Sequence, residues 1–168
     1  TTDRMANYGY ETGKTGFMIG AGWEQYSDVY FSPELSTFYE KLDTNQTASQ
    51  KMKDQEGEYF DIAFGYKLDL DKRNQKYQTT DGYRSRFYQN IPMISDDYAF
   101  LNSYDYTTFN QFGDMVTRFA FLARTINSMN GEDVRISKRL YIPTKRLRGF
   151  ESGRIGPTDG GDYIGGNH

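Results

Sequence analysis

The chain has 168 residues, of which 17% are aromatic, and its 20 Lys or Arg against 23 Asp or Glu give a net charge of −3 at pH 7. This near balance argues against a general nucleic-acid binder, and no window reaches the roughly 18 consecutive apolar residues of a transmembrane helix. The absence of cysteine excludes disulfides, thiolate nucleophiles and Cys-ligated metals within these residues.

Seven runs of alternating apolar and polar residues follow one another along the chain, which is the period-2 pattern of strands with two different faces. The clearest run, about 58–70, places Phe60 and Phe64 on one face and Asp61 and Lys67 on the other. The predicted strands are 4–11, 16–26, 34–43, 58–70, 83–91, 98–109 and 115–126. Turns are predicted at Thr12-Gly13-Lys14, Ser32-Pro33, Asp81-Gly82, Pro92 with Asp96-Asp97, and Gly113-Asp114.

The length and charge pattern of these runs favour strands that cross a bilayer. They span roughly 9–12 residues, longer than the usual 5–6 of soluble strands and close to the 9–11 that a tilted membrane strand needs. Away from their ends, the clearest runs carry charge on one face only, and a lipid-facing Lys or Arg at the bilayer centre costs roughly 2–4 kcal/mol. Candidates for interfacial girdles are Trp23, Tyr26, Tyr59 and Tyr98.

Two interpretations of the strand pattern stay open at this point. A soluble, lipocalin-like ligand-binding barrel would turn the apolar face inward and the charged face to water. A membrane barrel fits the strand length better, but a single-chain bacterial barrel has an even count of at least eight strands, and open sheet edges are not tolerated in lipid. On the membrane interpretation, either one strand is misassigned or the chain is part of a larger barrel. We favour the second, in which 1–168 is an all-β, partial outer-membrane barrel domain whose residues 127–168 form a long surface loop.

The segment 135–148 stands out because it carries six cations and no carboxylate: Arg135, Lys138, Arg139, Lys145, Arg146 and Arg148. Such a run is ordinarily a solvated loop. Here it leads into Leu147-Arg148-Gly149-Phe150 and then a glycine-rich tail. A strand, an aliphatic-Arg-Gly-Phe motif and such a tail, in this order, resemble the long surface loop of the BamA-type outer-membrane protein assembly factors, the bacterial surface antigen family.

A second stretch resembles the same family. Asp71-Lys72-Arg73 leads to Thr79-Thr80-Asp81-Gly82, which is similar to a periplasmic turn with an Asp-x-Arg segment followed by Pro-Thr-Asp-Gly. Thr79 stands where the family has proline, but Asp81 and Gly82 remain to reverse the chain. The resemblance implies an antiparallel barrel of about sixteen strands, of which this chain would supply about seven.

The resemblance also implies roles for the loop and for the whole protein. In the family the loop folds into the lumen, so Arg148, flanked by Leu147, Gly149 and Phe150, is expected to lock it against acidic and aromatic side chains that lie beyond His168. A guanidinium fork can bind carboxylate and stack on a ring. The implied function is folding and inserting β-barrel proteins into the bacterial outer membrane, with unfolded clients, accessory lipoproteins and the bilayer as partners. A two-partner-type secretion barrel or translocation-module barrel of the same superfamily is the alternative.

No catalytic arrangement emerges from the sequence. The single histidine is His168, so neither a Ser-His pair nor a His-metal cluster can be assembled. Asp69-x-Asp71-x-Arg73 departs from a calcium loop at its third ligand, and Asp96-Asp97 is expected to be solvated in a turn. We therefore expect no enzymatic activity, no cofactor, no metal and no nucleic-acid partner.

Overall fold

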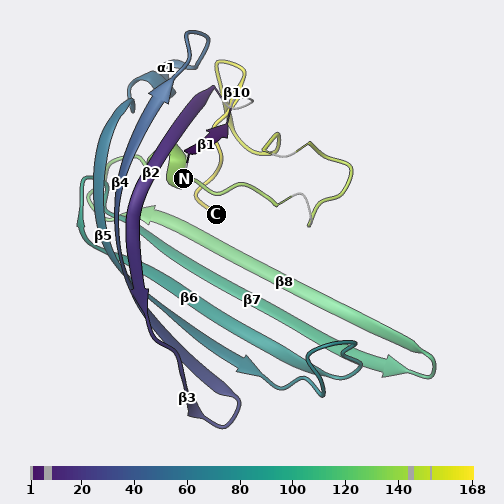
Figure 1. The fold of residues 1–168 in the computed structure, drawn as a ribbon. Helices are drawn as coiled ribbons and strands as arrows, with labels where there is room; N and C mark the ends of the chain where they lie inside the picture. Colours follow the sequence, from purple (N-terminus) through teal and green to yellow (C-terminus); the bar gives the residue numbers. More distant parts are fainter. Residues whose placement is uncertain (1, 6–8, 144–145, 152) are drawn as a thin grey trace.

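The computed structural model describes residues 2–5, 9–143, 146–151 and 153–168. Its main feature is one curved antiparallel sheet of long strands (Figure 1). The strands of this sheet are β1 (Thr2–Met5), β2 (Tyr10–Gly20), β3 (Trp23–Tyr26), β4 (Val29–Thr44), β5 (Gly57–Asp71), β6 (Gly82–Ser95), β7 (Ala99–Phe112) and β8 (Met115–Ser128). The order across the sheet is β1-β2-β4-β5-β6-β7-β8, and β3 pairs with β4 beyond the end of β2.

The two faces of the sheet are chemically opposite, as the alternation predicts. On β5, Phe60 and Leu68 are 42% and 40% exposed, whereas Asp61 and Asp69 are only 8% and 7% exposed. A soluble protein exposes its charges and buries its large apolar side chains. Here the convex face is apolar and the concave face is charged, which is the pattern of a membrane barrel with a wet lumen. The soluble, lipocalin-like alternative, with its apolar face inward, does not fit this arrangement.

The predicted strands 58–70, 83–91, 98–109 and 115–126 correspond to β5, β6, β7 and β8. Each of these strands continues beyond its predicted last residue, and β7 begins one residue later than predicted. At the other end of the sheet, the predicted strand 4–11 is wrong, because β1 ends at Met5 and β2 begins at Tyr10. Gly9 precedes β2 with φ of +80°, a left-handed value that interrupts an extended strand.

Two predicted turns are also wrong. Thr12-Gly13-Lys14 lies inside β2, where Gly13 pairs with Lys41 of β4. Ser32-Pro33 lies inside β4, and the chain reverses instead at Ser27-Asp28, where Asp28 has φ of +66°. The main-chain oxygen of Pro33 accepts a hydrogen bond from Ala21 N at 3.1 Å, in the gap between β2 and β3. Proline is tolerated there because the ladder is interrupted on the side where its missing N–H would point.

The remaining connections divide between the two ends of the sheet. One end carries the two-residue turn Gly113-Asp114, confirmed with Gly113 at φ of +60°, and the β5–β6 connection 72–81. The opposite end carries 45–56, with the short helix α1 (Gln50–Lys53), and 96–98. Among the described residues, no helix combines the length and the apolar character needed to span a membrane.

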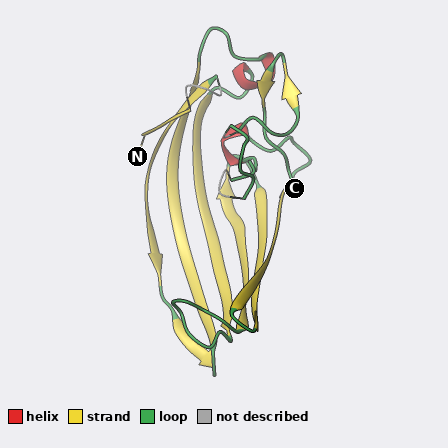
Figure 2. Ribbon diagram, turned by 90° about the vertical axis from the view of Figure 1, so that its right-hand side faces the viewer, coloured by secondary structure: helices red, strands yellow, loops and turns green. Residues whose placement is uncertain are grey.

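The rest of the chain follows β8, which ends at Ser128, one residue beyond the start of the predicted loop 127–168. We call the described residues between 129 and 168 the docked segment. It contains the single-turn helix η2 (Ile136–Lys138) and the hairpin of β9 (Thr158–Asp159) and β10 (Asp162–Tyr163). The docked segment lies on the concave side of the sheet, near the end that carries α1 (Figures 1 and 2).

The apolar core lies where the docked segment meets the sheet. One cluster of buried residues comprises Tyr10, Leu42, Ala48, Met52, Ile136 and Ile164. A second comprises Ala99, Ile126 and Val134. Both combine side chains of the sheet with side chains of the docked segment, so burial of apolar surface, worth roughly 25 cal/mol per Å², holds the segment against the concave face.

Candidate functional site

The most distinctive polar feature of the interior is the side chain of Arg135, which is only 2% exposed. Its Nη2 donates a hydrogen bond to Asp61 Oδ2 at 2.7 Å and lies 3.3 Å from Glu40 Oε2. Its main-chain N–H donates to Asp97 Oδ2 at 3.3 Å. Three carboxylates, from β4, β5 and the β6–β7 turn, therefore surround one guanidinium of the docked segment. We call these four residues the arginine cage.

An aromatic ring completes the surroundings of the guanidinium. The Arg135 Cζ lies 4.0 Å from the centroid of the Tyr59 ring, within the range of a cation–π contact. The Tyr59 hydroxyl donates to the main-chain oxygen of Gln55 at 2.6 Å, and Gln55 Oε1 accepts from Ile136 N at 2.7 Å. The prediction of Tyr59 as an interfacial girdle residue is therefore wrong, because its place on the concave face directs it at the cage.

A second cation, Lys138, lies at the edge of the cage. Its Nζ donates to Asp61 Oδ1 at 2.9 Å and to the main-chain oxygen of Asp97 at 3.1 Å. Burial lowers the pKa of the Lys138 ammonium, and the positive charge of Arg135 beside it lowers that pKa further. With Glu40 included, two cations of the docked segment face three carboxylates of the wall, so the segment is held by charge as well as by apolar contact.

The turn that contributes Asp97 is ordered by its own hydrogen bonds. Asp97 is 7% exposed, and its main-chain N–H donates to Ser95 Oγ at 3.1 Å. Ser95 Oγ also lies within hydrogen-bond distance of Asp61. Asp96 Oδ2 accepts from Phe60 N at 2.7 Å. The expectation that Asp96-Asp97 is solvated is therefore wrong for Asp97, whose carboxylate is enclosed by the docked segment.

The far part of the docked segment closes over α1. Asp162 Oδ2 accepts from Ser49 N at 2.9 Å, and Asp159 Oδ2 accepts from Lys51 N at 3.4 Å. Main-chain N–H groups at the start of a helix lack partners within it, and carboxylates satisfy them well. The β9–β10 hairpin thus caps the helix of another connection and ties two loops together at one end of the sheet.

The predicted locking motif lies elsewhere in the docked segment. Leu147 is half-buried, Arg148 and Gly149 are exposed, and Phe150 is 58% exposed. Gly149 has φ of +89°, a conformation that favours glycine. Among the described residues, Arg148 has no hydrogen bond or ion pair. Instead, Arg146 Nη2 donates to Asp105 Oδ2 on β7 at 2.6 Å. Among the described cations of the basic run, Arg135, Lys138 and Arg146 therefore form ion pairs with carboxylates of the sheet and its turns.

The predicted periplasmic turn residues do come together. Arg73 forms two hydrogen bonds of 2.7 Å with the carboxylate of Asp71, which raises the pKa of the Arg73 guanidinium. Gly82 has φ of +95°, and a Cβ there would lie 2.2 Å from the Lys72 main-chain oxygen. The main-chain oxygen of Asp81 accepts from Asn74 N at 3.1 Å. This motif closes the connection between β5 and β6.

Sequence reasoning singled out the basic run 135–148 but missed Arg135 as its buried member. A local signal was present, because Arg135 stands between Val134 and Ile136, which are 1% and 2% exposed. Among the described residues, no group of three His, Cys, Asp or Glu side chains is arranged to hold a metal ion.

Comparison with known proteins gives the family. The model of the Omp85 superfamily domain matches residues 1–168, the whole length of the chain. No curated protein matches the chain in a sequence search. Superfamily members are outer-membrane barrels with roles in protein insertion or translocation. The apolar convex face, the charged concave face and the segment docked inside the curve fit such a barrel. The chain belongs to the Omp85 superfamily.

Proposed function

We propose that this chain is part of a bacterial outer-membrane protein assembly factor, which folds β-barrel proteins and inserts them into the membrane. The observation that carries the proposal is the docked segment itself. It is anchored on the concave face through the arginine cage, and it carries the motif Leu147–Phe150, in which Arg148, Gly149 and Phe150 are exposed. This combination supports a barrel whose lumen holds an anchored loop, with the motif Leu147–Phe150 free to make further contacts.

The anchoring favours assembly over transport through the lumen. Two buried apolar clusters and a buried ion cluster fix the docked segment against the wall. A secretion pore has to move such a segment aside for every passenger, at the cost of exposing Arg135 and its carboxylates. An assembly factor passes no polypeptide through the whole lumen, so the docked segment can stay bound to the wall while a client folds into the membrane. The folding of the client would supply the energy, since strand pairing satisfies backbone groups that lipid cannot.

The motif Leu147–Phe150 is proposed to bind the wall of the complete barrel. Arg148, Gly149 and Phe150 are exposed, and they belong to a segment that lies on the concave side of the sheet. We infer that Arg148 binds acidic and aromatic side chains of wall strands outside the described ones, and that Phe150 packs beside it. Unfolded outer-membrane proteins, accessory lipoproteins and the lipid bilayer are the proposed partners.

Reconstitution tests this function. The complete protein would be placed in lipid vesicles, and an urea-unfolded β-barrel client would be added. We expect the client to reach its folded, heat-sensitive gel mobility faster than in vesicles without the protein. A client folding rate equal to that of empty vesicles would contradict the proposal. Export of a soluble passenger into the vesicle lumen, without faster client folding, would favour the two-partner or translocation alternative.

A further inference from the structure

A group of cations gathers around a single carboxylate on the concave face. Lys67 of β5, Arg86 of β6 and Arg124 of β8 line a cavity of about 200 Å³ together with Asp105 of β7. Arg146 of the docked segment reaches the same carboxylate from the lumen side. We call the four cations the cationic belt. It places four positive charges against one negative charge within a chain whose net charge is −3.

The strand register places two of the belt cations, Lys67 and Arg124, in one row across the concave face. Lys67 pairs with Tyr88, Tyr88 with Ser103, and Ser103 with Arg124, so these residues lie side by side across β5, β6, β7 and β8. Side chains at directly paired positions of an antiparallel sheet share a face and lie about 5 Å apart. The ammonium of Lys67, the hydroxyl of Ser103 and the guanidinium of Arg124 therefore enter one cavity.

Both oxygens of the Asp105 carboxylate already contact guanidinium groups. Asp105 Oδ1 lies 3.2 Å from Arg86 Nη2, and Asp105 Oδ2 lies 2.6 Å from Arg146 Nη2. The next carboxylate along β5, Asp69, accepts two hydrogen bonds from Arg84. Within the described part of the chain, neither Lys67 nor Arg124 has a hydrogen bond or an ion pair. Their charges are left without an anion.

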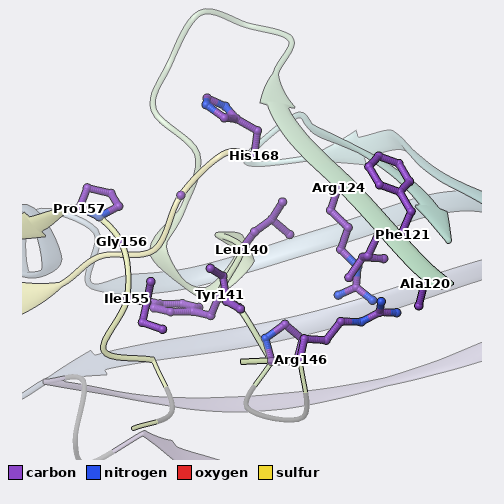
Figure 3. Close-up of a pocket in the computed structure, with 14 residues that line it drawn as sticks. Ala120, Phe121, Arg124, Leu140, Tyr141, Arg146, Ile155, Gly156, Pro157 and His168 are labelled. Atoms are coloured by element: carbon purple, nitrogen blue, oxygen red, sulfur yellow. The ribbon is translucent and has the colours of Figure 1, made fainter. Parts of the chain in front are cut away.

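A larger cavity adjoins the belt. It has a volume of about 510 Å³, and Arg124 lines it as well as the smaller one. Figure 3 shows the guanidinium ends of Arg124 and Arg146 directed to the same side of this cavity. Leu140, Ile142 and other apolar side chains line the rest of it. Two guanidinium groups that converge beside apolar side chains repel each other unless an anion lies between them.

We propose that the cationic belt is a binding site for the side-chain carboxylates of an acidic polypeptide segment that enters the lumen. Arginine forks match carboxylates bidentately, and the apolar lining beside Arg124 suits the aliphatic part of such a segment. The concave face is the lumen side of the sheet, where polypeptide, and not lipid, has access. The site is separate from the arginine cage, whose carboxylates already hold their cations.

Peptide binding tests the proposal. The complete protein in lipid nanodiscs would be titrated with a tetraglutamate peptide that carries an uncharged fluorophore, and with a tetralysine peptide of equal length. We expect the glutamate peptide alone to bind, and the double variant Lys67→Met/Arg124→Met to weaken its binding at least tenfold. Arg118→Met is the matched control. Arg118 lies on the same face of β8 as Arg124, but it lines neither cavity. Its Cζ lies 6.0 Å from the centroid of the Phe109 ring.

Other results would overturn the proposal. If Lys67→Met/Arg124→Met binds the glutamate peptide with unchanged affinity, the cationic belt is not the binding site. If the protein binds inorganic phosphate but not the glutamate peptide, a polypeptide carboxylate is not the ligand. Folding is checked separately by the temperature at which the protein loses its compact gel mobility. Because the variant removes cations that repel their neighbours, we expect that temperature to be equal or higher. A lower temperature would mean that Lys67 and Arg124 stabilise the wall, which also contradicts the proposal.

Discussion

Arg135 and Asp61 are 74 positions apart in the chain, yet the guanidinium Nη2 of one lies 2.7 Å from the carboxylate Oδ2 of the other. Asp61 faces the lumen from β5, and Arg135 reaches it from the docked segment. Both side chains are buried. A buried charge is tolerated only when it is paired. Arg135 meets this condition through Asp61, Glu40 and Asp97, and Asp61 through Arg135 and Lys138.

Replacement of the guanidinium is therefore expected to release the docked segment. In Arg135→Met, the carboxylate of Glu40 loses the Arg135 guanidinium, and Asp61 keeps Lys138 as its remaining cation, while the side-chain volume is nearly kept. Breaking one side of a buried ion pair costs about 3–5 kcal/mol. We expect a lower temperature for the loss of compact gel mobility and faster proteolysis within the docked segment, both measured on the complete protein in detergent.

The control for this experiment is Arg154→Met. Arg154 belongs to the same segment but pairs with Glu151 at an exposed site, where side-chain exposures are 54% and 62%. Exposed pairs contribute about 0–1 kcal/mol, so Arg154→Met is expected to behave like the parent protein. Equal effects of the two substitutions would mean that the docked segment does not depend on the cage.

The lipid-facing side of the sheet can be tested with two neighbours on β2. Ile19 and Met18 are both large, apolar and exposed, at 68% and 54%. Ile19 pairs with Leu35 on the convex face, whereas Met18 pairs with the buried Ser36 on the concave face. Ile19→Arg is expected to cost roughly 2–4 kcal/mol of membrane stability, and Met18→Arg much less.

The measurement is the amount of folded protein recovered from outer membranes for each variant. A larger loss for Met18→Arg than for Ile19→Arg would reverse the assignment of the two faces.

Gly82 is expected to be the least replaceable residue of the β5–β6 connection. In Gly82→Ala, the new Cβ would meet the Lys72 main-chain oxygen at 2.2 Å, and its φ of +95° is itself strained for alanine. We expect a loss of more than about 1–2 kcal/mol, the range for left-handed strain alone. Gly113→Ala provides the comparison, since φ there is +60° but no atom lies within 4 Å of the new Cβ. Unfolding midpoints that rank Gly113→Ala as the more damaging change would contradict the described turn.

A substitution at Arg148 tests the proposed function of the loop separately from its anchoring by the arginine cage. Arg148 is exposed among the described residues, so Arg148→Ala is expected to leave the arginine cage intact. If Arg148 locks the tip of the loop, the same variant lowers the steady-state amount of other outer-membrane proteins in cells. Unchanged levels of those proteins, together with an unchanged loop position, would remove Arg148 from the proposed mechanism.

The sequence predicts the faces of the sheet well, because alternation records the environment of each residue directly. Phe60 and Asp61 are neighbours in the chain and face opposite ways, as predicted. Strand ends and breaks are less predictable. Gly13 and Pro33 are strong local turn signals, yet both lie in long strands, because pairing across the sheet decides their conformation. Gly13 pairs with Lys41 of β4, and Pro33 pairs with Tyr66 of β5.

The anchor could not be predicted for a different reason. The apolar neighbours of Arg135 are a local signal of its burial, but nothing in the run 135–148 shows which of its six cations meets an acid, since Asp61 and Asp97 lie 74 and 38 positions away from Arg135. The resemblance directed attention to Arg148 instead. Only the folded sheet brings the two carboxylates together beside Arg135.

The arginine cage holds the docked segment against the wall. A cysteine pair measures this directly, since the chain has no cysteine of its own. In Asp105→Cys/Arg146→Cys, which replaces a contact of 2.6 Å, a short bismaleimide should crosslink β7 to the docked segment in most molecules. Adding Arg135→Met should abolish most of that crosslinking, whereas adding Arg154→Met should not. Equally efficient crosslinking in the presence of Arg135→Met would contradict the claim.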